Sequence, residues 1–145
     1  TMLTNGTGMF TATLKTAGTW SLAATDTANS SLTGNQTGIV VNPGAATHFT
    51  ISAPSSVASL SVFSITITAL DAYGNTATGY LGTVGFSSSN SNDYALMPSS
   101  YKFTSSDRGV HTIVGLRLLG SGQHTITVFD MSNRNTQGSF ITNVS

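Results

Sequence analysis

The chain is poor in charge and lacks several residue types on which protein chemistry depends. It contains no cysteine, and charged residues make up 7% of its 145 residues, against roughly 25% in an average globular protein. All the acidic residues are aspartate, and five Lys and Arg balance the five of them. The absence of cysteine excludes a disulfide framework and a cysteine-based zinc site. Five scattered cations cannot form the basic stripe that nucleic acids or anionic lipids require.

Catalytic and membrane-spanning patterns are missing as well. No apolar run approaches the roughly 20 residues of a membrane helix, and no nucleophile motif or phosphate-binding glycine pattern occurs. Glutamate, the usual glycosidase acid, is absent. The three histidines, His48, His111 and His124, have no metal-ligand spacing. We therefore predict a protein that is not an enzyme, does not enter a membrane and does not bind nucleic acid.

Hydroxyl residues and alternating apolar residues fill the chain instead. Threonine, serine, glycine and asparagine make up almost half of it. In residues 63–69, 124–128 and 20–24, every second side chain is apolar and most of those between are hydroxyls, which is typical of half-buried strands. Turn residues separate the runs, so the sequence predicts an all-β antiparallel sandwich without helices. The expected strands lie near residues 8–14, 19–25, 36–41, 47–53, 61–70, 80–87, 94–97, 100–104, 110–118, 123–129 and 138–144.

An internal repeat divides the chain. Residues 8–11 resemble residues 109–112, and after a slip of three residues the offset becomes 104. Residues 1–42 are then the C-terminal half of one repeat, its last three strands, and residues 43–145 are a complete repeat of about seven strands. The short joint 42–46 contains Pro43 and should be semi-rigid. The matching pairs are Leu14 and Leu118, Gly18 and Gly122, Asp26 and Asp130, Asn29 and Asn133, and Gly34 and Gly138.

Four segments resemble a known repeat. Residues 24–31, 41–49, 68–80 and 107–112 are similar to tandem bacterial immunoglobulin-like repeats of large extracellular surface and adhesin-type proteins, of the invasin and intimin kind. The resemblance implies an immunoglobulin-like sandwich and an extracellular or cell-surface location. It also implies that the loops after the second and sixth strands lie at one pole with the joint.

The incomplete first repeat poses a physical problem. Three strands cannot close a sandwich, and they would leave an apolar sheet face and two edges in water. Strands of a second copy, packing onto the complete repeat, or another partner could cover this face. Our hypothesis is pairing between chains, which could extend head to tail into a filament.

Two sets of residues are candidates for binding. Asp71, Asn75 and Asp130 fall in the loops of the shared pole, and their oxygens are the kind that Ca²⁺ prefers; the alternative, which we favour, is that Asp and Asn simply form turns. Tyr73 and Tyr94 lie in turn and loop sequence and could contact a glycan.

The sequence thus predicts a non-catalytic extracellular spacer module that assembles through strand pairing with neighbouring repeats or with another copy. It needs no cofactor unless calcium binds. The alternatives are an adhesin or carbohydrate-binding accessory module, and a filament or surface-layer subunit.

Overall fold

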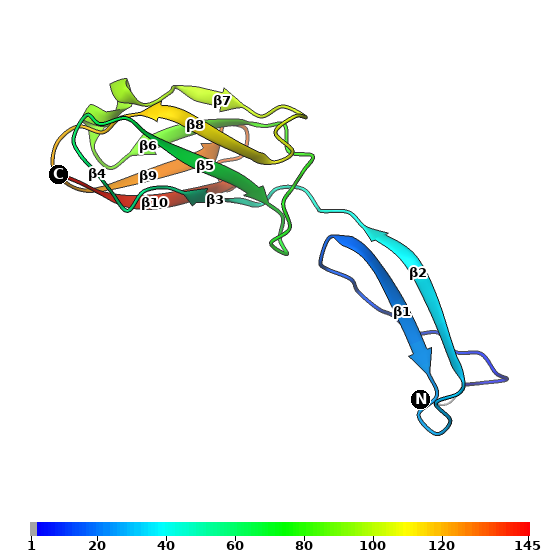
Figure 1. Ribbon diagram of the computed structural model, residues 1–145. Coiled ribbons are helices and arrows are strands. Elements are labelled where there is room, and N and C mark those ends of the chain that lie inside the picture. The colour runs from blue at the N-terminus through cyan, green and yellow to red at the C-terminus, as the bar shows by residue number, and fades with distance from the viewer. Residues whose placement is uncertain (1–2) are drawn as a thin grey trace. The chain divides into compact units, whose positions relative to one another are not determined.

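The chain forms two compact units, which a computed structural model describes for residues 3–145. The division falls between Asn42 and Pro43 (Figure 1). The elements are β1 (Gly18–Thr25), β2 (Thr33–Val41), β3 (His48–Ser52), β4 (Ser56–Val57), β5 (Phe63–Leu70), β6 (Thr83–Ser88), the 3-10 helix η1 (Ser91–Leu96), β7 (Ser100–Lys102), β8 (Val110–Leu116), β9 (Gly122–Asp130) and β10 (Gln137–Val144).

The second unit is a sandwich of two sheets. One sheet has the order β4-β10-β9-β6-β7 and the other has the order β3-β5-β8. All neighbours are antiparallel except β4, which runs parallel to β10. Every second residue of β5 is buried, as the alternation predicts, because its hydroxyl residues occupy the outer face. There the Thr66 and Thr112 hydroxyls hydrogen-bond across β5 and β8 at 2.9 Å. The predicted all-β, immunoglobulin-like fold is confirmed.

One expected strand of this unit is a helix. Residues 94–97 were expected to be extended, yet η1 covers Ser91–Leu96. The Asn90 side chain caps its first turn by accepting a hydrogen bond from the backbone N–H of Asn92. Asp93, in the first turn, is fully buried. A local cap and one buried carboxylate therefore override the strand pattern, and the expectation of a chain without helices is wrong at this segment.

The first unit is a hairpin without a core. β1 and β2 pair antiparallel in a sheet of two strands. A bulge between Trp20 and Leu22 shifts the register, and Gly38 opposite it has φ +72°, a conformation that glycine adopts readily. None of residues 3–42 is buried. The strand expected at 8–14 is not formed. Its repeat counterpart β8 pairs with β5, and the described part of the first unit has no equivalent of β5.

Candidate functional site

The two hairpins of the chain are built on the same aspartate turn. The Oδ1 atom of Asp26 accepts hydrogen bonds from the backbone N–H groups two and three residues further on, at 2.7 and 2.8 Å. Asp130 does the same at 2.7 and 3.0 Å. In both turns the aspartate N–H also donates to a carbonyl six residues on, at 2.9 Å. The β1–β2 hairpin therefore repeats the β9–β10 hairpin in its hydrogen bonds as well as in its sequence.

The same hairpin is covered in one unit and open in the other. The inward side chains of β9 before Asp130 are at most 3% exposed, because the β3-β5-β8 sheet packs over them. Their counterparts Trp20 and Leu22 on β1 are 42% and 41% exposed. The first unit therefore presents an apolar sheet face, which is rare unless it binds something. The covered residues are His124, Ile126 and Val128.

The two turn aspartates differ at their second oxygen. Asp130 Oδ2 accepts a short hydrogen bond from the Tyr80 hydroxyl. The Tyr80 ring meets Phe49 and Phe103 edge to face, with centroids 5.4 and 5.0 Å away. Burial raises the pKa of Tyr80 far above its usual range, and the hydrogen bond and charge of Asp130 raise it further. Asp26 Oδ2 accepts no hydrogen bond from residues 3–145. Asp26 lines an open groove of about 480 Å³ together with the apolar residues Leu3, Phe10, Ala24 and Leu32 and the threonines Thr25 and Thr27.

Asp71 lies at the pole where the joint enters the second unit, and it is almost fully buried. The side-chain amide of Asn75 donates to it at 2.9 Å, and so does the Asn75 backbone N–H. The backbone N–H groups of Tyr73 and Gly44 each donate at 2.8 Å. The Asn75 amide, followed by the Gly44 N–H, holds the pKa of Asp71 well below its usual range. Asp71 thereby fixes the turn after β5 and ties it to the joint.

This arrangement favours turn formation over calcium binding. Ca²⁺ takes six to eight oxygens, whereas the Asp71 oxygens face N–H donors. Asp130 belongs to a different cluster with Tyr80. No group of three or more His, Cys, Asp or Glu that could hold a metal occurs within the described range. Calcium at Asp71, Asn75 and Asp130 stays a prediction, to be tested by melting with EDTA and with added calcium.

The two tyrosines chosen as glycan contacts lie apart. Both are more than half exposed. Tyr73 is in the turn after β5, and Tyr94 is in η1 with its hydroxyl 3.5 Å from the Ser88 carbonyl. Figure 1 shows the turn after β5 and the helical segment at opposite ends of the second unit. Each tyrosine could contact a sugar alone, but the two do not form a common platform.

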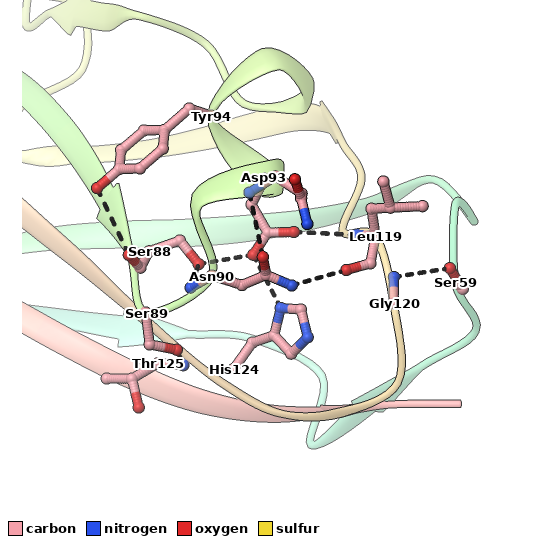
Figure 2. Close-up of polar contacts among 11 residues, drawn as sticks. Ser59, Ser88, Ser89, Asn90, Asp93, Tyr94, Leu119, Gly120, His124 and Thr125 are labelled. Carbon is pink, nitrogen blue, oxygen red and sulfur yellow. Dashed lines mark hydrogen bonds and ion pairs between the residues drawn. The ribbon is translucent and has the colours of Figure 1, made fainter.

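Sequence reasoning missed a buried polar cluster around Asp93 (Figure 2). Its Oδ2 accepts a 2.6 Å hydrogen bond from the Ser88 hydroxyl and lies 2.8 Å from His124 Nδ1. Its Oδ1 accepts a 2.9 Å hydrogen bond from the Leu119 N–H. The cluster ties η1, β6, β9 and the loop after β8 together. Since Ser88 bonds the carboxylate rather than the imidazole, the histidine does not activate the hydroxyl as a base would. Asp93 and His124 are 31 residues apart, so no motif signals their meeting.

A second His–Asp pair closes the turn before β8. His111 Nδ1 lies 2.7 Å from Asp107, and the His111 ring stacks on Tyr101 with centroids 3.7 Å apart. The backbone N–H of Thr104 is the main cause that lowers the pKa of Asp107, and it donates at 2.6 Å. Burial, reinforced by Asp107, raises the pKa of Tyr101. These groups satisfy one another inside the turn.

Two facing sheets, a buried alternating core and polar clusters that fasten turns define the second unit as an immunoglobulin-like β-sandwich. A similar solved structure is that of FdeC, described as a broadly conserved Escherichia coli adhesin eliciting protection against urinary tract infections. The TM-score is 0.52 with 22% sequence identity, over 77% of this chain and 35% of that chain. A likeness at this identity shows the fold.

No protein-family model matches the chain, and no curated protein matches it. No helix in residues 3–145 is long and apolar enough to cross a membrane.

Proposed function

We propose that the chain is a non-catalytic spacer module of a large extracellular surface protein, placed at the cell surface. The observation that carries this proposal is the covalent path through the second unit. The chain enters before β3 at one end of the sandwich, and the C-terminus of β10 lies at the other end (Figure 1). A pull along this path loads the backbone ladders of β10 with β9 and with β4 along the strand direction. The module then transmits force without dedicated chemistry.

The joint supports the same proposal. Gly44 is hydrogen-bonded to Asp71, so the first residues of the second unit are held to its pole rather than left free. Pro43 restricts the backbone directly before this bond. A spacer needs both properties, because a floppy joint would not hold a neighbouring module at a distance.

One observation favours a second candidate, a binding module. FdeC is an adhesin, although the matched region is about a third of its length. In this candidate Tyr73, in the turn after β5, or Tyr94, in η1, contacts a glycan, because both are exposed aromatic residues. Aromatic loop residues are common in binding surfaces of many kinds.

Force spectroscopy on the chain tests the spacer. We expect one cooperative rupture that releases roughly 35 nm, the extended length of residues 43–145 at about 3.4 Å per residue, with extension of the hairpin before it at low force. A glycan array serves as the competing test. Extension without a distinct rupture would overturn the spacer, and array binding lost on Tyr94→Ala or Tyr73→Ala would establish the binding module.

A further inference from the structure

The geometry points to a specific partner for the open face of β1–β2: the N-terminal half of another immunoglobulin-like repeat, with strands equivalent to β3–β7 and a tyrosine placed like Tyr80. We call this partner the acceptor half; within the chain itself it corresponds to residues 43–108. This inference rests on the proposed function, because the partner is a further module of the same kind. It also names the contacts by which that module is recognised.

Gly34 on β2 indicates where the backbone of the partner would cross the β1–β2 hairpin. A Cβ at Gly138 of β10 would lie 2.1 Å from the Phe49 carbonyl oxygen of β3, so no larger residue fits there. Its counterpart Gly34 on β2 has nothing within 4 Å of that position. Glycine weakens a strand interior and commonly marks the close approach of another backbone. Nothing in residues 3–42 makes such an approach, so Gly34 fits a strand from elsewhere that crosses as β3 does.

Asp26 indicates a hydrogen bond that the same partner would donate. Its Oδ1 completes the turn, as in Asp130, while its Oδ2 lacks the hydroxyl donor that Tyr80 supplies to Asp130. A tyrosine from an acceptor half would fill this place. Apolar side chains and two threonines, Thr25 and Thr27, line the groove beside Asp26, so it can take an aromatic ring that carries one hydroxyl.

The free edge of β1 gives the register of the added strand. In the second unit β6 pairs antiparallel with β9, with Val84 opposite Asp130 and Phe86 opposite Val128. β1 is paired with β2 only. A strand added in the β6 register would place its residue equivalent to Phe86 opposite Ala24. The other sheet of the partner would offer segment 8–14 the strand that β5 offers β8.

Counting strands shows that other copies of these 145 residues cannot cover every hairpin. Each copy has one acceptor half and two hairpins, β1–β2 and β9–β10. However the copies exchange strands, one hairpin per copy stays uncovered. Packing two open faces against each other would cover Trp20, yet residues 1–42 contain no tyrosine to place like Tyr80, and residues 3–42 form no strand equivalent to β3. The acceptor half therefore comes from outside these residues.

Fusing a second copy of residues 43–108 directly ahead of residue 8 tests the inference. Trp20 is the only tryptophan, so its fluorescence reports coverage of the face. We expect a blue shift, at least threefold weaker acrylamide quenching, and hydrogen-exchange protection of β1 and β2. Trp20 remaining as exposed as in the unfused chain would overturn the inference. A concentration-dependent dimer of the unfused chain with Trp20 covered would overturn it too, in favour of a second copy.

Matched variants separate docking from folding. Gly34→Val should leave the unfused chain unchanged, since its Cβ meets open space, but should abolish Trp20 coverage in the fusion. Asn35→Val adds the same side chain at the neighbouring position and should preserve coverage, because its counterpart Ser139 is exposed.

Tyr80→Phe in the fused copy alone should lower the melting temperature of the completed repeat. Equal effects of Gly34→Val and Asn35→Val would contradict the crossing strand. The force measurement depends on residues 43–145, so the spacer and this partner can fail separately.

Discussion

Each of the five aspartates of this chain accepts a backbone N–H. Asp26, Asp71 and Asp130 do so in turns that follow a strand, whereas Asp93 and Asp107 hold N–H groups of the loop after β8 and of the turn before it. A short side chain reaches the nearby backbone in this way, and glutamate is one methylene too long for the tightest of these turns. The absence of glutamate thus has a structural reading: the acids serve as turn fasteners rather than as surface charges.

Asp71 should make stability depend on acid. Its folded pKa lies below the ordinary value of 3.8, so its contribution is present above that value and is lost as the pH falls below it. We expect the melting temperature of the chain to fall between about pH 5 and pH 2. Asp71→Asn should lower it at pH 7 and flatten this acid slope. Asp26→Asn, in the unit without a core, is the control. Identical slopes for Asp71→Asn and the parent chain would contradict the assignment.

The Asp93 cluster should matter to stability more than any exposed loop residue. Asp93→Ala removes the acceptor for the Ser88 hydroxyl, the Leu119 N–H and His124, and both Asp93 and His124 are buried. Leaving such groups unpaired costs about 3 kcal/mol of unfolding free energy, measurable by urea denaturation. Tyr94→Ala, one residue along in η1, is the matched control and should cost less than about 1 kcal/mol. A similar loss for both variants would show that η1, rather than the carboxylate, carries the effect.

At the scale of elements, alternation was a reliable guide only where a neighbouring strand exists. β5 and β9 follow their predicted pattern because each packs its apolar face against the opposite sheet. Segment 8–14 has a similar pattern but forms no strand, since its pairing partner is not among residues 3–42. Periodicity predicts which face of a segment is buried once the segment is paired in a sheet. Whether it is paired depends on the rest of the fold.

The candidate sites divide in the same way. The Asp71–Asn75 pair was predictable because an Asp-x-x-Gly-Asn turn is local. The Asp93–His124 pair was not, because loops set its distance rather than any spacing in the sequence. The equivalence of Asp26 and Asp130 was visible in the repeat, but their difference, a missing tyrosine hydroxyl, needed the structure.

Hydrogen exchange should separate the two hairpins. Two strands alone are marginally stable in water, and β1–β2 has no buried residue. We expect amides of β1 and β2 to exchange at least a hundredfold faster than the matching amides of β9 and β10, because the latter open only with the sandwich. The native chain must be measured at several dilutions, so that contacts between chains are lost. Equal protection of β1 and β9 at every dilution would show that the first unit is covered within a single chain.

At the scale of the whole molecule, the buried core of the described residues lies in the second unit. All residues of the buried hydrophobic cluster lie between Phe49 and Val144. Removing residues 1–42 should therefore leave the main melting temperature within about 2 °C of the parent value, since 1 kcal/mol corresponds to roughly 4–8 °C in a domain of this size. Circular dichroism melting of both chains measures this. A fall of more than about 5 °C would mean that the first unit stabilises the second.

The outer faces of the strands bear on the medium in which the molecule works. They carry many threonines and serines, and pairs such as Thr66–Thr112 join neighbouring strands by hydroxyl hydrogen bonds. At 0.1 M, dissolved salt screens interactions between charges over about 10 Å, but it does not screen hydrogen bonds between neutral hydroxyls in this way. Hydroxyl pairs of this kind therefore hold neighbouring strands together without charges that salt would screen. We expect added salt to affect this surface less than one whose strands are joined by ion pairs.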